Sequence, residues 1–323
     1  PITRKRLTMN NKRLLNHISN KTAIRGFSIL EFLVASLLSM IVLMAVSSTY
    51  FTARGLNKSA NARIGIQQDL RNAANMIVRD ARMAGNFGCF NMANFPASAV
   101  IEDKSSDEYT LKTAGVNNLL PVKEINKLSY TGFTQIGPAL LFQYGIDIDI
   151  DKKNPNAKTA IVSSCSGIIK LDNLDNLNTA KSTLAKSGPE GSIAIMKHEM
   201  IAYAVGTLGE ESKELSLFRF QLSDDGSWGN PQLLIKGITT MDIQYIYAEC
   251  PDSESASASG TNAETFKYKD VLDISAEAKS PASIQIVLNN GSIDPSKEQD
   301  NKVDIYNINA TIRGGNVCAD RSL

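Results

Sequence analysis

The sequence predicts an α+β protein in which a long N-terminal α-helix, transmembrane in its first half, packs its second half on an antiparallel β-sheet domain. Three observations predict this class. Proline is absent from Phe27 to Ala84, the apolar residues there change from an all-round distribution to a single stripe, and the rest of the chain alternates short β-branched runs with turn signals. We divide the chain into residues 1–26, 27–53, 54–85 and 86–323.

Residues 1–26 form a basic segment. They carry seven Lys and Arg side chains and no Asp or Glu, which leaves 27 basic against 33 acidic side chains in the other residues, a net charge of −6. This mildly acidic remainder does not favour nucleic acid as a partner, because binding to phosphates requires clustered positive charge.

Residues 27–53 are apolar and hold one charge, Glu31. Their length suffices for a membrane helix, which needs ~20 residues. The basic flank places the N-terminal side in the cytoplasm and the residues after Arg54 outside the inner membrane. An ordinary secretory signal is an alternative, but its apolar core spans only ~7–15 residues. A plain signal anchor leaves Glu31 unexplained, because a charge at mid-bilayer costs ~2.5–3.5 kcal/mol.

The junction of these two segments reads Arg25-Gly26-Phe27-Ser28-Ile29-Leu30-Glu31-Phe32-Leu33-Val34-Ala35. It closely resembles the cleavage signal of type IV prepilins. The resemblance implies that a prepilin peptidase cuts between Gly26 and Phe27 and methylates the new Phe27 amine. It also implies that Glu31 pairs with the Phe27 ammonium of a neighbouring subunit during filament assembly. The plainer alternative for Glu31 is a favourable position near the positive end of the helix dipole. A native start at Met9 would shorten the leader to residues 9–26.

Residues 54–85 continue the helix with one apolar face. Apolar residues recur at spacings of three and four, at Ile66, Leu70, Ala73, Ile77, Ala81 and Ala84. We expect the charged residues to lie away from this stripe, at Arg63, Asp69, Arg71, Asp80 and Arg82. Gly85 is the expected terminator of the helix.

Several further segments resemble the PilW/PilJ branch of minor pilins. They are Gln68–Ala74, Arg79–Phe90 with its Gly88-Cys89 pair, Leu233–Ile238, Met241–Tyr245 and Ile305–Arg313, whereas residues 95–210 match no family. The resemblance implies a pilin-like fold and a minor pilin that joins other minor pilins in a complex priming pilus assembly near the tip. It implies no enzymatic activity and no cofactor.

The same resemblance sets expectations for partners and location. The partners are other minor pilins, the major pilin, the prepilin peptidase, the inner-membrane assembly platform, membrane lipid and a large tip adhesin. The chain would cross the inner membrane of a Gram-negative bacterium once, with a periplasmic domain, before entering the extracellular pilus. Two alternatives stay open: a minor pseudopilin of type II secretion, of the GspJ kind, and a signal-anchored periplasmic binding protein.

Residues 86–323 show the pattern of a β-rich domain. Expected strands are 139–146, 159–163, 193–197, 200–206, 214–222, 232–236, 241–248, 282–289 and 303–313. Asp224-Asp225-Gly226 is typical of a hairpin turn. The Ser- and Ala-rich segment from Ser253 to Ala263 is expected to be a loop.

The four cysteines, Cys89, Cys165, Cys250 and Cys318, are expected to form two disulfides in an oxidising compartment. Four cysteines allow three pairings, of which we favour Cys89–Cys165 with Cys250–Cys318. The alternative is four free, buried thiols.

Residues that favour catalysis or metal binding are scarce. The histidines are His17, in the leader, and His198, which we expect to be exposed at a turn or strand edge between residues 193–197 and 200–206. Asp147, Asp149 and Asp151 alternate with isoleucines, but Lys152 and Lys158 occupy the positions that an EF-hand gives to Gly and Glu. The alternation instead predicts a strand with one carboxylate face, and we expect no metal site.

Overall fold

The computed structural model describes residues 27–104, 109–147, 158–172, 174–185, 193–209, 214–249, 265–290 and 304–313. The chain forms two compact units, Pro1–Ala62 and Arg63–Leu323. The helices are α1 (Ile29–Met83) and α2 (Leu177–Ala185), and short 3-10 turns are η1 (Met92–Asn94), η2 (Ala97–Ala99) and η4 (Leu174–Asn176).

The strands confirm most of the expected β segments. They are β1 (Asn86–Phe87), β2 (Phe90–Asn91), β3 (Val100–Asp103), β4 (Val122–Ile125), β5 (Phe133–Asp147), β6 (Ala160–Ser163), β7 (Ile168–Lys170), β8 (Ala194–Leu208), β9 (Ser216–Gln221), β10 (Gln232–Lys236), β11 (Thr240–Glu249), β12 (Thr265–Lys269), β13 (Ser283–Asn290) and β14 (Asp304–Thr311).

Helix α1 lies within the stretch predicted from Phe27 to Ala84, and it begins at Ile29 and ends at Met83. Ser28 precedes the first helical residue, and its hydroxyl accepts a hydrogen bond from the Leu30 N–H at 3.3 Å. Gly85 has a φ of +80°, which a residue with a side chain rarely adopts, and so it stops the helix after Met83. Proline is absent between these two residues, so no backbone donor is lost inside the helix.

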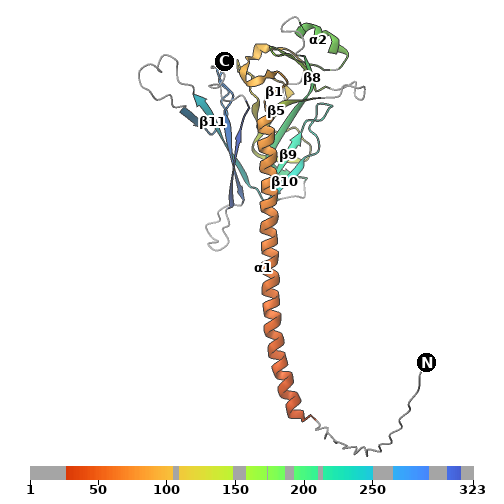
Figure 1. Cartoon of the computed structure of the whole chain (residues 1–323), viewed down its shortest axis with the longest axis vertical. Helices are drawn as coiled ribbons and strands as arrows, with labels where there is room; N and C mark the ends of the chain where they lie inside the picture. Colours follow the sequence, from red (N-terminus) through yellow and green to blue (C-terminus); the bar gives the residue numbers. More distant parts are fainter. Residues whose placement is uncertain are drawn as a thin grey trace, which may run out of the picture. The chain divides into compact units, whose positions relative to one another are not determined.

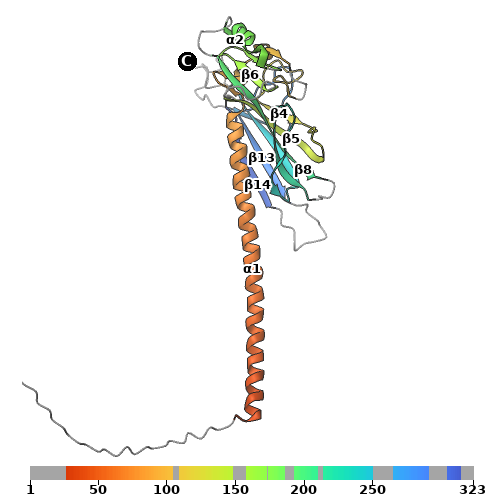
Figure 2. The ribbon, with the colours of Figure 1, turned by 90° about the vertical axis from the view of Figure 1, so that its right-hand side faces the viewer.

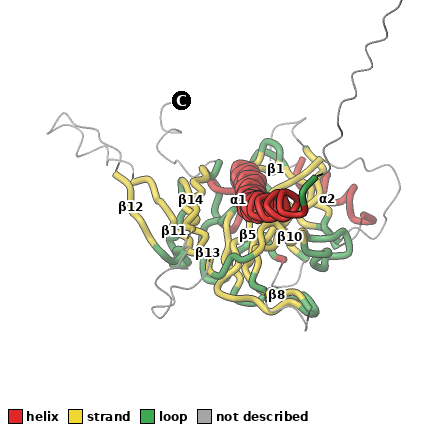
Figure 3. Tube along the Cα trace, turned by 90° about the horizontal axis from the view of Figure 1, so that it is seen from below, coloured by secondary structure: helices red, strands yellow, loops and turns green. Residues whose placement is uncertain are grey.

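The larger sheet has eight strands and a mixed topology. Its path runs β10-β9-β8-β6-β7-β3, while β5 pairs with β8 and β4 pairs with β5. All these pairs are antiparallel except β3 with β7, which is parallel. Figure 3 shows the strands of this sheet around β5 and β8.

The smaller sheet is antiparallel and has the order β12-β11-β13-β14. Figure 2 shows β13 and β14 beside the C-terminal part of α1. The expectation of one antiparallel sheet was therefore wrong in two respects, because the domain has two main sheets and one contains a parallel pair. Parallel pairing of β3 with β7 joins residues far apart in the chain, so no local turn signal predicts it.

One core joins the second half of α1 to both sheets. The stripe residues Leu70, Ala73, Ile77 and Ala81 are buried with inward-facing side chains of β5, β8, β11 and β13. Figure 1 shows α1 against the strands labelled β5, β8 and β9. This confirms the predicted apolar stripe. Residues 54–64 of α1 are exposed, and burial of the helix against the domain begins only at Gly65 and Ile66. The expected boundary at residue 54 therefore lies too early in the chain.

The turn chemistry of the β-domain agrees partly with expectation. The hairpin at Asp224-Asp225-Gly226 is confirmed, because antiparallel β9 and β10 flank it and Gly226 has a φ of +81°. The expected break between residues 197 and 200 was wrong, because β8 runs unbroken through it. Ile146 and Asp147 are both exposed at the end of β5, and Asp149, Asp151 and Ser253–Ala263 lie outside the described residues.

Candidate functional site

The first part of α1 exposes its apolar side chains on every side. Each large apolar residue from Phe27 to Leu56 is more than half exposed, for example Phe27 at 75% and Ile41 at 56%. A window of 18 residues in α1 has a mean hydropathy of 2.5. The helix is therefore long and apolar enough to cross a membrane, a property shared by membrane anchors and signal segments.

Four hydroxyl groups inside this apolar segment are satisfied by the helix itself. Hydroxyl groups donate to backbone carbonyls three or four residues earlier, at Ser36, Ser39, Thr49 and Thr52. A helix with no unpaired hydroxyl at these positions can leave water at a small cost, because few polar groups lose hydrogen bonds.

Glu31 lies three residues after the helix-capping Ser28 and is exposed. This Ser-x-x-Glu spacing is the capping-box pattern, in which both side chains serve free N–H groups of the first turn. This sequence spacing favours a local capping role for Glu31, in addition to the role that the prepilin resemblance implies. Gly26 lies outside the described residues, and Phe27 precedes the helix.

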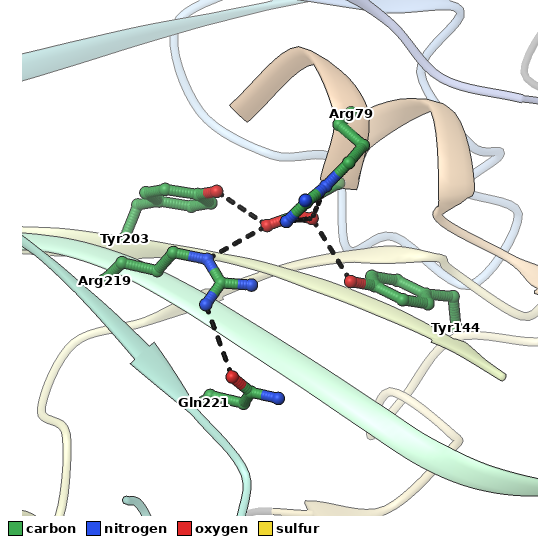
Figure 4. Close-up of polar contacts among 6 residues, drawn as sticks. Arg79, Tyr144, Tyr203, Arg219 and Gln221 are labelled. Carbon is green, nitrogen blue, oxygen red and sulfur yellow. Dashed lines mark hydrogen bonds and ion pairs between the residues drawn. The ribbon is translucent and has the colours of Figure 1, made fainter. Parts of the chain in front are cut away.

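The second part of α1 carries a buried carboxylate that sequence analysis misplaced. Asp80 was expected on the solvent face, but it is fully buried. Its Oδ1 accepts hydrogen bonds from the Tyr144 hydroxyl and from Arg79 Nη2, both at 3.2 Å. Its Oδ2 accepts from the Tyr203 hydroxyl at 2.7 Å and from Arg219 Nε at 3.2 Å. Figure 4 shows these side chains converging on the carboxylate.

Three of the four partners of Asp80 come from neighbouring strands, and the fourth, Arg79, precedes Asp80 in α1. Tyr144 belongs to β5, Tyr203 to β8 and Arg219 to β9. One helix side chain thus fixes the rotation and height of α1 against the larger sheet. The sequence spacing could have predicted the burial of Asp80. Asp80 follows Ile77 by three residues and precedes Ala84 by four, which places it beside the apolar stripe.

Electrostatics keep the three strand side chains of this network protonated. Burial, followed by the charge of Asp80, raises the pKa of both Tyr144 and Tyr203 well above the ordinary tyrosine value. Both phenols therefore stay protonated and act as donors. Burial has the largest single effect on the pKa of Arg219 and lowers it, but the charges and hydrogen bonds of Asp80 and Tyr203 together raise this pKa above its ordinary value.

A disulfide links the turn between β1 and β2 to the turn between β6 and β7. Cys89 lies between β1 and β2, Cys165 lies between β6 and β7, and their sulfurs are bonded. The Ser163 hydroxyl also donates to the Phe87 carbonyl oxygen at 2.8 Å, so the two turns have a second link. The predicted Cys89–Cys165 pair is confirmed, whereas Cys250 and Cys318 lie outside the described residues.

His198 is buried inside β8, which corrects the expectation of an exposed turn residue. Its Nε2 lies 3.2 Å from Gln143 Oε1. Gln143 Nε2 donates to the carbonyls of Leu111 and Leu120, so its Oε1 must accept, and His198 Nε2 carries the proton. Burial and the charges of Lys170 and Lys123 hold the pKa of His198 well below its usual value. The imidazole is therefore neutral.

Two lysines bind the backbone of the segment that follows β3. Lys170 Nζ donates to the Tyr109 carbonyl, and Lys123 Nζ donates to the carbonyls of Thr110 and Lys112. Burial lowers the pKa of Lys123 to about 7, with a further contribution from the charge of Lys170. Burial likewise lowers the pKa of Lys170 to about 8.

This lowering of the lysine pKa values predicts a pH dependence of stability. The unfolded chain keeps these lysines protonated up to about pH 10, so it binds more protons than the folded chain between pH 7 and 10. The free energy of unfolding should therefore rise with pH, by about 3–4 kcal/mol from pH 7 to pH 9 for the two lysines together. In Lys123→Met this slope should decrease, whereas the exposed Lys127→Met should retain it. Urea unfolding at several pH values measures both, and an unchanged slope in Lys123→Met would refute the assignment.

Within the described ranges, no group of three or more His, Cys, Asp or Glu side chains has an arrangement that would hold a metal ion. Comparison with known proteins adds no relative: no family model, no curated protein and no solved structure matches the chain.

Proposed function

We propose that this chain is a minor pilin of a type IV pilus, a filament subunit of the PilW/PilJ kind with a pilin-like fold and no catalytic role. The observation that carries the proposal is the first part of α1, in which every large apolar side chain is more than half exposed and Glu31 is the only charge from Phe27 to Ala53. A helix that is apolar all round must be surrounded by lipid or by other apolar helices.

A pilin needs both environments in succession. In the inner membrane, the helix from Phe27 to Ala53 would span the bilayer. In the filament, equivalent helices of neighbouring subunits, among them other minor pilins and the major pilin, would replace the lipid. The apolar surface of the helix stays buried during this exchange. Because apolar contacts are not directional, a polar contact is needed to fix how far one subunit is shifted along the filament from the next.

Glu31 and the amine of Phe27 suit that contact. Cleavage after Gly26 would leave an ammonium group on Phe27, and Glu31 lies four residues further, ~6 Å along a helix axis. A carboxylate and an ammonium from adjacent subunits would neutralise each other in an apolar surrounding, where either charge alone is costly.

The Arg63–Leu323 unit supports the proposal in two ways. The buried Asp80 network clamps the second half of α1 to the larger sheet, so a force on the helix is transmitted to the domain. The Cys89–Cys165 disulfide suits an oxidising periplasm or exterior.

Processing of the N-terminus tests the proposal directly. N-terminal sequencing and intact mass of the protein from cells with and without the prepilin peptidase should give a methylated Phe27 start that depends on the peptidase. A start upstream of residue 26, or cleavage near residue 50 by an ordinary signal peptidase, would contradict the proposal and favour an anchored or secreted binding protein.

Glu31 variants test the assembly mechanism. Glu31→Ala should insert into the membrane and be cleaved normally, yet enter filaments more than tenfold less, because loss of one partner from a buried ion pair costs ~3–5 kcal/mol. Immunoblots of sheared filaments against whole cells measure this ratio. Glu31→Gln is the matched control, because glutamine preserves a capping box but not the charge. Normal incorporation of Glu31→Gln would assign Glu31 to helix capping and refute the ion pair.

A further inference from the structure

Strand β11 has an edge that its neighbours leave partly open. Its partner β13 pairs along Thr240–Ile246, but β12 pairs only along Tyr245–Glu249. Among the described strands, the part from Thr240 to Gln244 is therefore hydrogen-bonded on one side only. Alternate residues of an antiparallel strand direct their N–H and C=O groups away from a given neighbour, so this part has backbone groups along its other side that pair with no described strand.

A cleft borders residues 241–244 of β11. It has a volume of about 600 Å³ and is lined by the β11 residues 241–244, by Glu124 and Pro138 of the larger sheet, by Asp270 after β12, and by two residues of β13. Five residues of an extended chain cover ~17 Å, the length of the open part of β11. The cleft therefore combines a backbone edge with walls that can contact side chains.

Among the described residues that line the cleft, the charged side chains are all acidic. Three carboxylates line it, from Glu124, Asp242 and Asp270, and no Lys, Arg or His does. Their hydrogen-bond donors are neutral: the Tyr245 hydroxyl binds Glu124 Oε1 at 2.7 Å, Asn289 Nδ2 binds Asp242 Oδ2 at 3.0 Å, and Gln244 Nε2 binds Asp270 Oδ1 at 3.1 Å. None of the three forms a salt bridge with another described residue.

We propose that this edge binds an extended peptide segment bearing Lys or Arg, which adds as a further strand beside residues 240–244. The backbone of the segment pairs with the open edge of β11, and its basic side chains contact Asp242 and Asp270. Strand addition supplies affinity through main-chain hydrogen bonds and selectivity through side-chain contacts. This inference is independent of the proposed filament role, because it rests only on the Arg63–Leu323 unit.

Peptide chemistry tests the proposal without altering the protein. The probe is acetyl-Thr-Lys-Val-Lys-Thr-amide, titrated into the full chain in detergent micelles by calorimetry. Binding should be saturable and should weaken more than tenfold when both lysines are replaced by glutamates. N-methylation of alternate residues provides the decisive comparison. Methylation of one alternate set should abolish binding, and methylation of the other should spare it, because only alternate N–H groups face the neighbouring strand.

Protein variants test the acidic walls. Asp242→Asn with Asp270→Asn should weaken binding of the probe at least tenfold, whereas Asp69→Asn, an exposed change on α1, should leave it unchanged. The proposal is overturned if the folded protein does not bind the probe at about 1 mM, a free energy of only about −4 kcal/mol. Equal binding of both N-methylated peptides would also overturn the proposal. It would be overturned as well if calcium bound in the cleft and the peptide did not.

Discussion

Replacing Asp80 with asparagine is expected to lower the free energy of unfolding by about 3–5 kcal/mol. The side chain is fully buried, and its two oxygens accept from Tyr144, Tyr203, Arg79 and Arg219. Asparagine removes the charge that compensates the guanidinium of Arg219, which is only 11% exposed. It also places an N–H₂ group against donors, so at least one buried donor loses its acceptor. Urea unfolding of the full chain in detergent, followed by the fluorescence of the single tryptophan, Trp228, measures the change.

Two comparisons make this expectation specific. Asp69→Asn, the same change at an exposed position of α1, should alter the free energy of unfolding by less than about 0.5 kcal/mol. Tyr203→Phe combined with Asp80→Asn should show a coupling energy of about 0.5–3 kcal/mol, because the two side chains share a 2.7 Å hydrogen bond. A loss below about 1 kcal/mol for Asp80→Asn would mean that the network does not hold α1 to the sheet.

Removing the Cys89–Cys165 disulfide is the second large change. The double variant Cys89→Ser with Cys165→Ser should unfold with a free energy lower by about 2–4 kcal/mol. The bond closes a loop with a sequence separation of 76 residues, so its loss restores conformational freedom to a long stretch of the unfolded chain. Thermal and urea unfolding under non-reducing conditions measure the difference.

A matched control separates the covalent bond from the contact between the two turns. Ser163→Ala removes the hydrogen bond to the Phe87 carbonyl but leaves the disulfide, and should cost only about 1 kcal/mol. If the double cysteine variant were as stable as the unaltered protein, the disulfide would contribute nothing to the fold. Intact mass with and without reductant checks how many disulfides each sample contains.

Local sequence patterns predicted much of the architecture. The absence of proline, together with Gly85 at the end, predicted the extent of α1, whereas the capping hydrogen bond of Ser28 became visible only in the structure. Runs of β-branched residues located most of the long strands. The short strands β3, β4, β7 and β12 were missed, because segments of three to five residues carry too little periodicity to stand out.

The candidate functional residues were likewise predicted only in part from the sequence. The apolar segment with Glu31 was visible in the sequence, because its composition alone distinguishes it. The polar run around His198 was misread as a turn, although His198 has a buried partner in Gln143, and Lys197 pairs with Asp224 at 2.7 Å. A polar residue can remain inside a strand when a distant residue satisfies it, and nothing in the local pattern records that partner.

The sequence by itself thus determined the long helix, its buried stripe, its exposed apolar part and the β-rich character of the rest. Only the tertiary structure decided that the strands form two main sheets, that β3 and β7 run parallel, and that Asp80 is buried. Tyr144 and Tyr203 lie 64 and 123 residues from Asp80. Helix and strand periods are local properties of the chain, whereas the pairing of buried polar groups depends on which distant segments meet, and packing settles that choice.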